Sequence, residues 1–435
     1  MRHSRPVVPR CKNPCSQRGM TLQFGVCKWS VGNPSVLETE VAATCSARPR
    51  AVFMWDERFD RNAYPDVVPF RTDRAAMARR TLMSMGMLSP ADEAPVCPAT
   101  REQIERFHDG HYLDVMLAAE RGDMGVEGLR MGFGTGDCPV FRGMYAHGAL
   151  AAGATLGAAE WILSGEATVA FNPHGGFHHA GPDYAAGFCY INDVVLGLLA
   201  LAEAGRRVLF LDIDVHHSDG VQDAFYQRDD VCVISMHETG RRLFPGTGFA
   251  HETGVQAGEG YSVNVPLPPG TYDDAYLRAY RAVAVPVIDH YDPDVIVVEV
   301  GMDGLVSDPL AELALTNNAH AAILADLLAR RKPILATGGG GYHPENSARG
   351  WALAWGVLSG QDVDADAALG LGGVMLSSTD WQGGLRDRVH EPLPDQREAV
   401  DRHVAGVIHD VIERVFPRLG LAPRDSSGGK DALGA

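Results

Sequence analysis

The feature that most constrains this chain is an alternation of short apolar runs with longer segments of helical spacing. The runs are four to six residues long, and most are continuously apolar. Such strands are typical of a parallel sheet covered on both faces by its crossover helices. The sequence therefore predicts a single-domain α/β fold with a mostly parallel central sheet and helices on both faces. The expected strands are 51–55, 168–171, 208–213, 231–235, 295–300 and 333–336, and the expected helices are 144–163, 192–203, 272–288, 317–330 and 344–358.

Composition changes at both ends of the chain suggest where this domain begins and ends. Residues 1–50 contain eight Lys or Arg against two Glu, together with several Pro, and residues 421–435 contain a Ser-Ser-Gly-Gly stretch. Segments of this kind favour flexible extensions over a packed core. We expect a flexible basic N-terminal extension over 1–50, one compact domain over 51–420 and a disordered tail over 421–435.

The charge balance narrows the classes of partner. The formal net charge is −17, whereas sequence-independent binding of nucleic acid needs a basic face. No run of about 18 apolar residues is present, so no membrane-spanning helix is expected. The first residues lack the apolar core of a secretory signal, and no Cys-x-x-Cys pair occurs. We expect a cytoplasmic protein that binds neither nucleic acid nor a membrane and whose acidic body attracts cationic substrates.

Polar residues follow the carboxyl ends of several predicted strands, which is where open α/β sheets bind ligands. Asp214 and His216 are two residues apart, so an extended backbone places both side chains on one side. Asp303, after another strand, could complete a set of two carboxylates and one imidazole that suits zinc or iron(II). Three protein ligands leave positions open for water and substrate. An Asp-x-His triplet alone is more typical of solvated loop residues, but several polar strand ends together favour a site.

Two further groups at strand ends carry possible chemistry. His178 and His179 follow two glycines, and either imidazole could take a proton from an attacking water if Asp212 or Asp219 fixed its tautomer. A His-His pair by itself is more often structural. Tyr342 follows four glycines, where its hydroxyl could donate to a substrate carbonyl. A phosphate-binding loop is the weaker interpretation, because no Lys-Ser/Thr follows the glycines.

These residues stand in motifs that resemble the zinc-dependent histone deacetylase family. That family includes the bacterial acetoin-utilisation proteins and acetylpolyamine amidohydrolases and has the arginase/deacetylase fold. The resemblance covers about residues 50–360, and the sequences of several motifs are closer to those of the class I eukaryotic enzymes. Eight segments occur in the same order as in the family, which makes the resemblance specific. They are GDCP (136–139), GFHHA (176–180), GFCYIND (187–193), DIDVHHSDG (212–220), FPGTG (244–248), YSVNVP (261–266), GMD (301–303) followed by DP (308–309), and GGGGY (338–342).

The resemblance implies a zinc-dependent amidohydrolase that removes an acetyl or other short acyl group from an amine such as acetyl-lysine. It implies that His179 is the general base and later the general acid, with Asp219 as its carboxylate partner. His178 would be the second histidine, backed by Asp212. Tyr342 would polarise the acyl carbonyl. The domain over 51–420 would then be the catalytic domain.

The resemblance also implies ion and substrate sites. Asp214, His216 and Asp303 match the metal ligands, which would hold Zn²⁺ or, in the cell, Fe²⁺. A structural K⁺ or Na⁺ would lie beside them, and an apolar channel would admit the acylated amine. The monovalent-cation site would use Asp212, Ser235 and the backbone carbonyls of Asp214, His216 and Met236, the channel would be formed by Gly187, Phe188, Phe244 and Leu310, and Arg74 would lie near the pocket floor.

Four residues depart from the family pattern, and one of them is His174, which is unusual before the paired histidines. Ser218 replaces a glycine and could crowd its loop or add a hydrogen bond. Gly304 replaces a larger residue, which predicts a roomier site. Ala146, with His147 beside it, stands where the family carries an acidic residue at the channel rim, which weakens the expectation of peptide-backbone recognition.

Other functions remain open at this stage. The substrate could be an acetylpolyamine or another small metabolite in place of acetyl-lysine. A manganese ureohydrolase of the arginase type would share the fold but needs a two-metal cluster with more carboxylates. A non-catalytic sensor that kept the pocket is a third interpretation.

Overall fold

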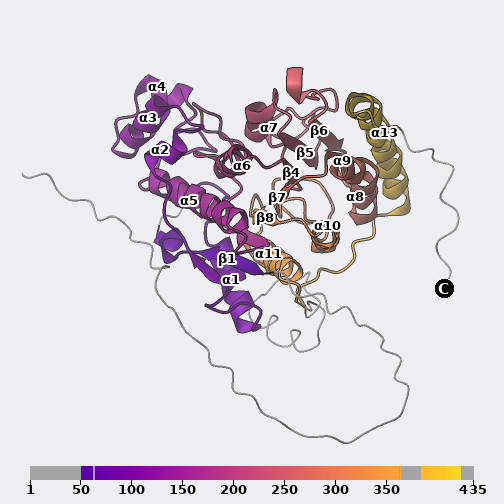
Figure 1. Cartoon of the computed structure of the whole chain (residues 1–435), viewed down its shortest axis with the longest axis horizontal. Helices are drawn as coiled ribbons and strands as arrows, with labels where there is room; N and C mark the ends of the chain where they lie inside the picture. Colours follow the sequence, from indigo (N-terminus) through magenta and orange to yellow (C-terminus); the bar gives the residue numbers. More distant parts are fainter. Residues whose placement is uncertain (1–49, 62–63, 362, 364–383, 423–435) are drawn as a thin grey trace, which may run out of the picture. The chain divides into compact units, whose positions relative to one another are not determined.

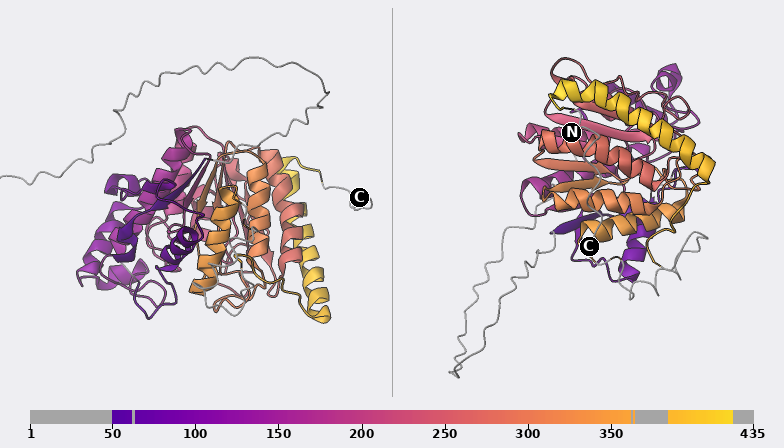
Figure 2. Two further views of the ribbon diagram at one scale, coloured as in Figure 1. Left: turned by 90° about the horizontal axis from the view of Figure 1, so that it is seen from below. Right: turned by 90° about the vertical axis from the view of Figure 1, so that its right-hand side faces the viewer.

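The computed structural model of this chain describes residues 50–61, 64–361, 363 and 384–422. Almost all of the expected N-terminal extension and C-terminal tail lies outside these ranges. The described residues form one eight-stranded sheet, in the order β2-β1-β3-β8-β7-β4-β5-β6, with every strand pairing parallel. Helices cover both faces (Figure 1, Figure 2). The predicted α/β fold with a parallel central sheet is confirmed.

Each predicted strand and helix overlaps an observed one. The strands and α-helices that the sequence pattern did not predict are β2, β6, α1, α2, α3, α4, α7 and α13. The predicted helix over 272–288 is divided by a π-helical segment, Tyr280–Ala284. The strands are β1 (Ala51–Trp55), β2 (Glu93–Pro95), β3 (Val169–Asn172), β4 (Val208–Asp212), β5 (Val231–Glu238), β6 (Ser262–Leu267), β7 (Val295–Glu299) and β8 (Ile334–Thr337). The α-helices are α1 (Arg74–Ser84), α2 (Arg101–Ile104), α3 (Gly110–Glu120), α4 (Gly125–Arg130), α5 (Met144–Leu163), α6 (Asp193–Glu203), α7 (Asp219–Phe225), α8 (Asp273–Ala279), α9 (Val285–Tyr291), α10 (Asn317–Ala329), α11 (Pro344–Leu358) and α13 (Pro394–Leu419).

The sheet separates two hydrophobic cores. Leu209 and Leu211 of β4 belong to the core that includes α8, α9, α10, α11 and α13, whereas Val208 and Phe210 belong to the core that includes α5 and α6. This division follows from the alternation of side chains along a strand. Both faces of β4 are fully buried, which explains why the apolar runs are continuous. Among the described residues, no helix has both the length and the apolar character needed to cross a membrane.

The strand order places four strand ends at the centre of one edge. The chain leaves β3 and continues at β4, and the two positions between them are filled later by β7 and β8. Such a change in winding direction opens a crevice at the carboxyl ends of the strands. The loops after β3, β4, β7 and β8 therefore meet there. Backbone hydrogen bonds join them, since Gly338 N–H donates to the Asn172 carbonyl at 2.9 Å and Val300 N–H to the Gly338 carbonyl at 2.9 Å.

Candidate metal centre and catalytic cluster

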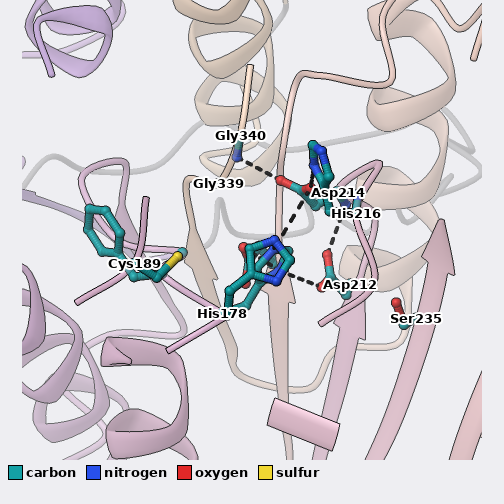
Figure 3. Close-up of polar contacts among 12 residues, drawn as sticks. His178, Cys189, Asp212, Asp214, His216, Ser235, Gly339 and Gly340 are labelled. Atoms are coloured by element: carbon teal, nitrogen blue, oxygen red, sulfur yellow. Dashed lines mark hydrogen bonds and ion pairs between the residues drawn. The ribbon is translucent and has the colours of Figure 1, made fainter. Parts of the chain in front are cut away.

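Three predicted metal ligands converge at this edge. Asp214 and His216 come from the loop after β4, and Asp303 comes from the loop after β7 (Figure 3 shows the first two). One ligand atom from each lies within 4.8 Å of the others. His216 Nδ1 is 2.9 Å from Asp303 Oδ2 and 3.2 Å from Asp214 Oδ1. All three side chains are buried, so residues separated by almost 90 positions form one compact donor set.

Backbone amides aim the two carboxylates. Val215 N–H donates to Asp303 Oδ1 at 3.0 Å, which leaves Oδ2 facing His216. Gly340 N–H donates to Asp214 Oδ2 at 2.6 Å. A Cβ atom on Gly340 would lie 1.9 Å from Asp303 Oδ2, so a glycine is required at that position. The glycine loop after β8 therefore closes directly over the donor set.

The donor set fits a divalent cation. Burial, and then the neighbouring Asp214 carboxylate, raise the pKa of Asp303, so a cation between the two carboxylates would relieve their repulsion. Two carboxylate oxygens and one imidazole nitrogen suit zinc or iron(II). Three protein ligands would leave coordination positions for water and substrate, as in catalytic sites.

Beside this set lie the two predicted histidine–carboxylate pairs. His178 Nδ1 is 2.9 Å from Asp212 Oδ2, and His179 Nδ1 is 2.7 Å from Asp219 Oδ1. The Nε2 atoms of the two histidines are 3.0 Å apart. Burial, followed by the charge of His178, lowers the pKa of His179 to about 4. A neutral His179 keeps one ring nitrogen unprotonated at neutral pH, which is the state in which an imidazole can accept a proton.

Glu299, the last residue of β7, is a member of this cluster that the sequence analysis missed. Its side chain is fully buried, and Oε1 is 3.0 Å from His178 Nδ1. His178 Nδ1 also lies 2.9 Å from Asp212 Oδ2, and neither Glu299 oxygen has a hydrogen-bond partner among the described residues. Burial would lower the pKa of His178, but the Glu299 and Asp212 carboxylates raise it well above its ordinary value. A single acidic residue inside the apolar β7 run was the available signal.

Tyr342 lines the same cavity as the two histidines, together with Asp214 and His216. Its ring centre is 6.2 Å from that of His216. Arg74, predicted near the pocket floor, is buried and donates to the Gly341 carbonyl at 2.6 Å and to the Gly339 carbonyl at 3.2 Å. Arg74 therefore holds the glycine loop that carries the tyrosine.

The predicted channel residues lie around this cavity. The Phe244 ring is 4.9 Å from the His179 ring, and the Phe188 ring is 5.6 Å from that of Tyr342. A Cβ atom on Gly187 would lie 2.4 Å from His179 and 2.9 Å from Phe244, so a side chain there would collide with both. Phe244 and Leu310 are 44% and 38% exposed, as expected for residues at a channel mouth.

The residues predicted to hold a monovalent cation lie on the adjacent strands. Asp212 of β4 pairs in register with Ser235 of β5, and both are fully buried. The Ser235 hydroxyl is 2.8 Å from His237 Nδ1, and the Met236 carbonyl accepts from the Tyr276 hydroxyl at 3.1 Å. These residues are adjacent, as the prediction requires, and the cation itself remains a prediction.

The departures from the family pattern have structural consequences. Ser218 is fully buried, and its hydroxyl has no hydrogen-bond partner in the described part of the chain, so it adds no hydrogen bond. A Cβ atom on Gly304 would be 3.2 Å from Leu315, so that leucine fills the space where a roomier site was expected. Ala146 is exposed, whereas His147 is buried.

Comparisons with known proteins agree with this geometry. Residues 68–358 match the family model of the histone deacetylase domain. The chain is 35% identical over 324 residues to the histone deacetylase RPD3 of Saccharomyces cerevisiae, covering 74% of each protein. It is 38% identical over 320 residues to the acetoin utilization protein AcuC of Bacillus subtilis, covering 72% of this chain and 83% of that protein. The crystal structure of an HDAC homologue complexed with SAHA matches with a TM-score of 0.74 at 31% identity, covering 83% of this chain and 99% of that one. The chain therefore belongs to the histone deacetylase family.

Proposed function

We propose that this deacetylase-family chain is a zinc-dependent hydrolase that removes an acetyl or other short acyl group from an acylated amine such as acetyl-lysine. The observation that carries the proposal is the convergence of the donor set with two histidine–carboxylate pairs and a tyrosine around one cavity. Asp214, His216 and Asp303 would hold the metal. The apolar rings of Phe188 and Phe244 would enclose the unbranched stem of the amine.

Different side chains of the cluster perform the separate steps of amide hydrolysis. When bound, zinc or iron(II) supplies Lewis-acid polarisation of a carbonyl oxygen. His179 takes the proton of the attacking water at Nε2 and later returns it to the leaving amine, while Asp219 holds its Nδ1–H. Tyr342 donates its hydroxyl to the oxygen on which negative charge develops. His178 and Asp212 keep a second imidazole beside His179.

Three finer features belong to the same proposal. A structural K⁺ or Na⁺ would bind at Asp212 and Ser235, beside the catalytic metal. A cytoplasmic location is supported by the free thiols of Cys138, Cys189 and Cys232, which suit a reducing compartment. The net charge of −17 favours cationic substrates and argues against a nucleic acid partner.

A reporter assay tests the proposed reaction. The purified full chain, loaded with zinc, is expected to release a fluorescent amine from an acetyl-lysine reporter. A chelator should abolish release, and added Zn²⁺ or Fe²⁺ should restore it. A parallel panel of acetylpolyamines and longer acyl-lysines would identify the substrate class. Failure to release amine from every member of the panel would refute the proposal.

One observation keeps the manganese ureohydrolase as a second candidate. His178, Asp212 and Glu299 also offer three buried ligand atoms within 4.8 Å of one another. Two metal ions per chain, with urea release from guanidino compounds, would favour that function. We favour the deacylase because Tyr342 lines the same cavity as the two histidines and suits carbonyl polarisation.

A further inference from the structure

The loop that carries Tyr342 has little intrinsic order. Residues 338–341 are all glycine, and Gly339 and Gly341 have φ angles of 146° and 124°. Glycine loses more backbone freedom on folding than any other residue, so such a loop is held in place only by outside contacts. The position of the tyrosine hydroxyl therefore depends on groups that grip this loop.

The side chains of Arg74 and Asp308 hold one peptide group of this loop from its two ends. Arg74 Nη1 donates to the Gly341 carbonyl at 2.6 Å, and Asp308 Oδ2 accepts from Tyr342 N–H at 2.7 Å. That carbonyl and that N–H belong to the same peptide bond. Arg74 is 3% and Asp308 is 8% exposed. These two hydrogen bonds hold the peptide at both ends. Burial raises the pKa of Asp308 to about 7, so the ionised form, whose two oxygens both accept hydrogen bonds, predominates above that pH.

Asp308 also organises the channel wall. Its second oxygen, Oδ1, accepts from Leu310 N–H at 2.9 Å, and its own N–H donates to the Leu305 carbonyl at 3.1 Å. The preceding Ser307 has a φ angle of 77°, which a non-glycine residue seldom adopts. The carboxylate thus joins the turn after β7 to the tyrosine loop after β8, and both of its oxygens are committed to backbone donors.

We propose that Asp308 is a positioning residue that acts through Tyr342, by fixing the peptide bond before it and joining it to the channel wall at Leu310. The inference rests on the role given to Tyr342 under the proposed function. An asparagine or glutamine side chain cannot replace the carboxylate. One of the two acceptor oxygens would become an NH₂ donor that faces a backbone N–H group.

A double-mutant cycle separates this role from general stabilisation of the fold. In the zinc-loaded full chain, Asp308→Asn is expected to lower kcat by about tenfold to a hundredfold, as small displacements of catalytic groups do, with KM and metal content little changed. In a Tyr342→Phe background the same substitution should lower kcat by less than about twofold, because the effects of coupled residues are not additive. Independent, multiplicative effects in the two backgrounds would overturn the inference.

A matched control and a second readout complete the test. Asp273 accepts from Thr316 N–H at 2.7 Å and also contacts the Thr316 hydroxyl, away from the tyrosine loop. Asp273→Asn should lower the melting temperature without lowering kcat. Amide hydrogen exchange over residues 338–342 should be faster in Asp308→Asn than in the wild type or the control. Exchange rates equal to those of the wild type would show that Asp308 does not hold this loop in place.

Two further comparisons deal with other outcomes. If Asp308→Asn does not fold, Asp308→Glu keeps both acceptors but moves them by one methylene, and the same coupling to Tyr342→Phe is expected. A wild-type chain without activity on any acylated amine would overturn the proposed function and, with it, the positioning role of Asp308 in the reaction. An active wild type with multiplicative effects would overturn only the present inference.

Discussion

At the scale of single residues, the two neighbouring histidines differ through their partners. His179 has one carboxylate, Asp219, and burial keeps it neutral, as a general base must be. His178 has two carboxylates at Nδ1, Asp212 and Glu299. Two acidic groups around one imidazole favour its positive charge. Identical side chains at adjacent positions are thereby prepared for different tasks.

Replacement of Tyr342 by Phe tests the carbonyl-polarising group. The change removes one hydroxyl from the buried cavity and leaves the ring in contact with Phe188. Loss of one donor to a developing oxyanion typically lowers kcat by about 10²–10³-fold, so most turnover should be lost. Metal analysis should find the wild-type zinc content, because no metal ligand is altered. Wild-type turnover in this variant would remove Tyr342 from the reaction.

Glu299→Gln tests a residue whose burial opposes stability. Burial raises the pKa of Glu299 well above its ordinary value. A carboxyl group whose pKa is higher in the folded than in the unfolded chain destabilises the folded state once the pH exceeds its pKa in the unfolded chain. In the metal-free chain at pH 7, the substitution should therefore increase the free energy of unfolding by about 1 kcal/mol or more. Urea unfolding of both proteins measures this difference.

The same substitution should lower turnover, because the carboxyl group 3.0 Å from His178 Nδ1 is replaced by an amide that cannot ionise. A gain in stability with a loss of kcat is the pattern expected when a residue is retained for function. A variant that is both less stable and fully active would contradict this account of Glu299.

At the scale of elements, the glycine loop between β8 and α11 closes the metal centre. Gly340→Ala would place a Cβ atom 1.9 Å from Asp303 Oδ2 and 3.0 Å from Asp214 Oδ2. The atoms that would collide are carboxylate oxygens whose side chains are held by backbone N–H groups of Val215 and Gly340, so the ligands must move. We expect weaker zinc binding, by about tenfold to a hundredfold, as when groups that orient metal ligands are removed.

Zinc titration with a competing chelator measures this loss. Gly406→Ala is the matched control, because an added Cβ in that exposed position of α13 meets no atom within 4 Å. It should bind zinc as the wild type does and gain slightly in stability, since alanine is the better helix former. Equal zinc affinity in the two variants would show that the loop tolerates a side chain.

At the scale of the whole molecule, buried neutral histidines predict acid sensitivity. Burial lowers the pKa of His108 and of His147 to about 4, and Asn192 N–H donates to His108 Nε2 at 2.9 Å, which requires the neutral ring. Between about pH 6.5 and pH 4 the unfolded chain binds more protons at these residues than the folded chain. Stability should therefore fall as the pH falls through this window.

The expected slope is about 1 kcal/mol per pH unit for each such histidine. Denaturant unfolding at pH 7.0, 6.0 and 5.0 measures it in the full chain. His147→Phe should make the slope shallower, because it removes one such histidine. The His147 ring has no hydrogen-bond partner among the described residues, so the substitution breaks no hydrogen bond there. An equally steep decline in the variant would show that other groups cause the acid sensitivity.

Much of the fold and site could be predicted from local patterns. The continuous apolar run of β4 shows that both of its faces are buried, and the Asp-x-His spacing places Asp214 and His216 on one side of the chain. The roles of Glu299 and Asp308 could not be assigned in this way. Asp308 stood only in a motif, and Glu299 was only an acidic residue within an apolar run. Each role depends on a contact with a distant segment: His178 for Glu299 and Tyr342 for Asp308.

The sequence by itself determined the α/β fold class and which side chains follow each strand, because side-chain direction and burial repeat over a few residues. Only the tertiary structure decided that β7 and β8 lie between β3 and β4. That order brings Asp303 within 2.9 Å of His216 and places Arg74 and Asp308 on one peptide bond. The physical reason is that strand order depends on packing between segments far apart in the chain, which local spacing does not encode.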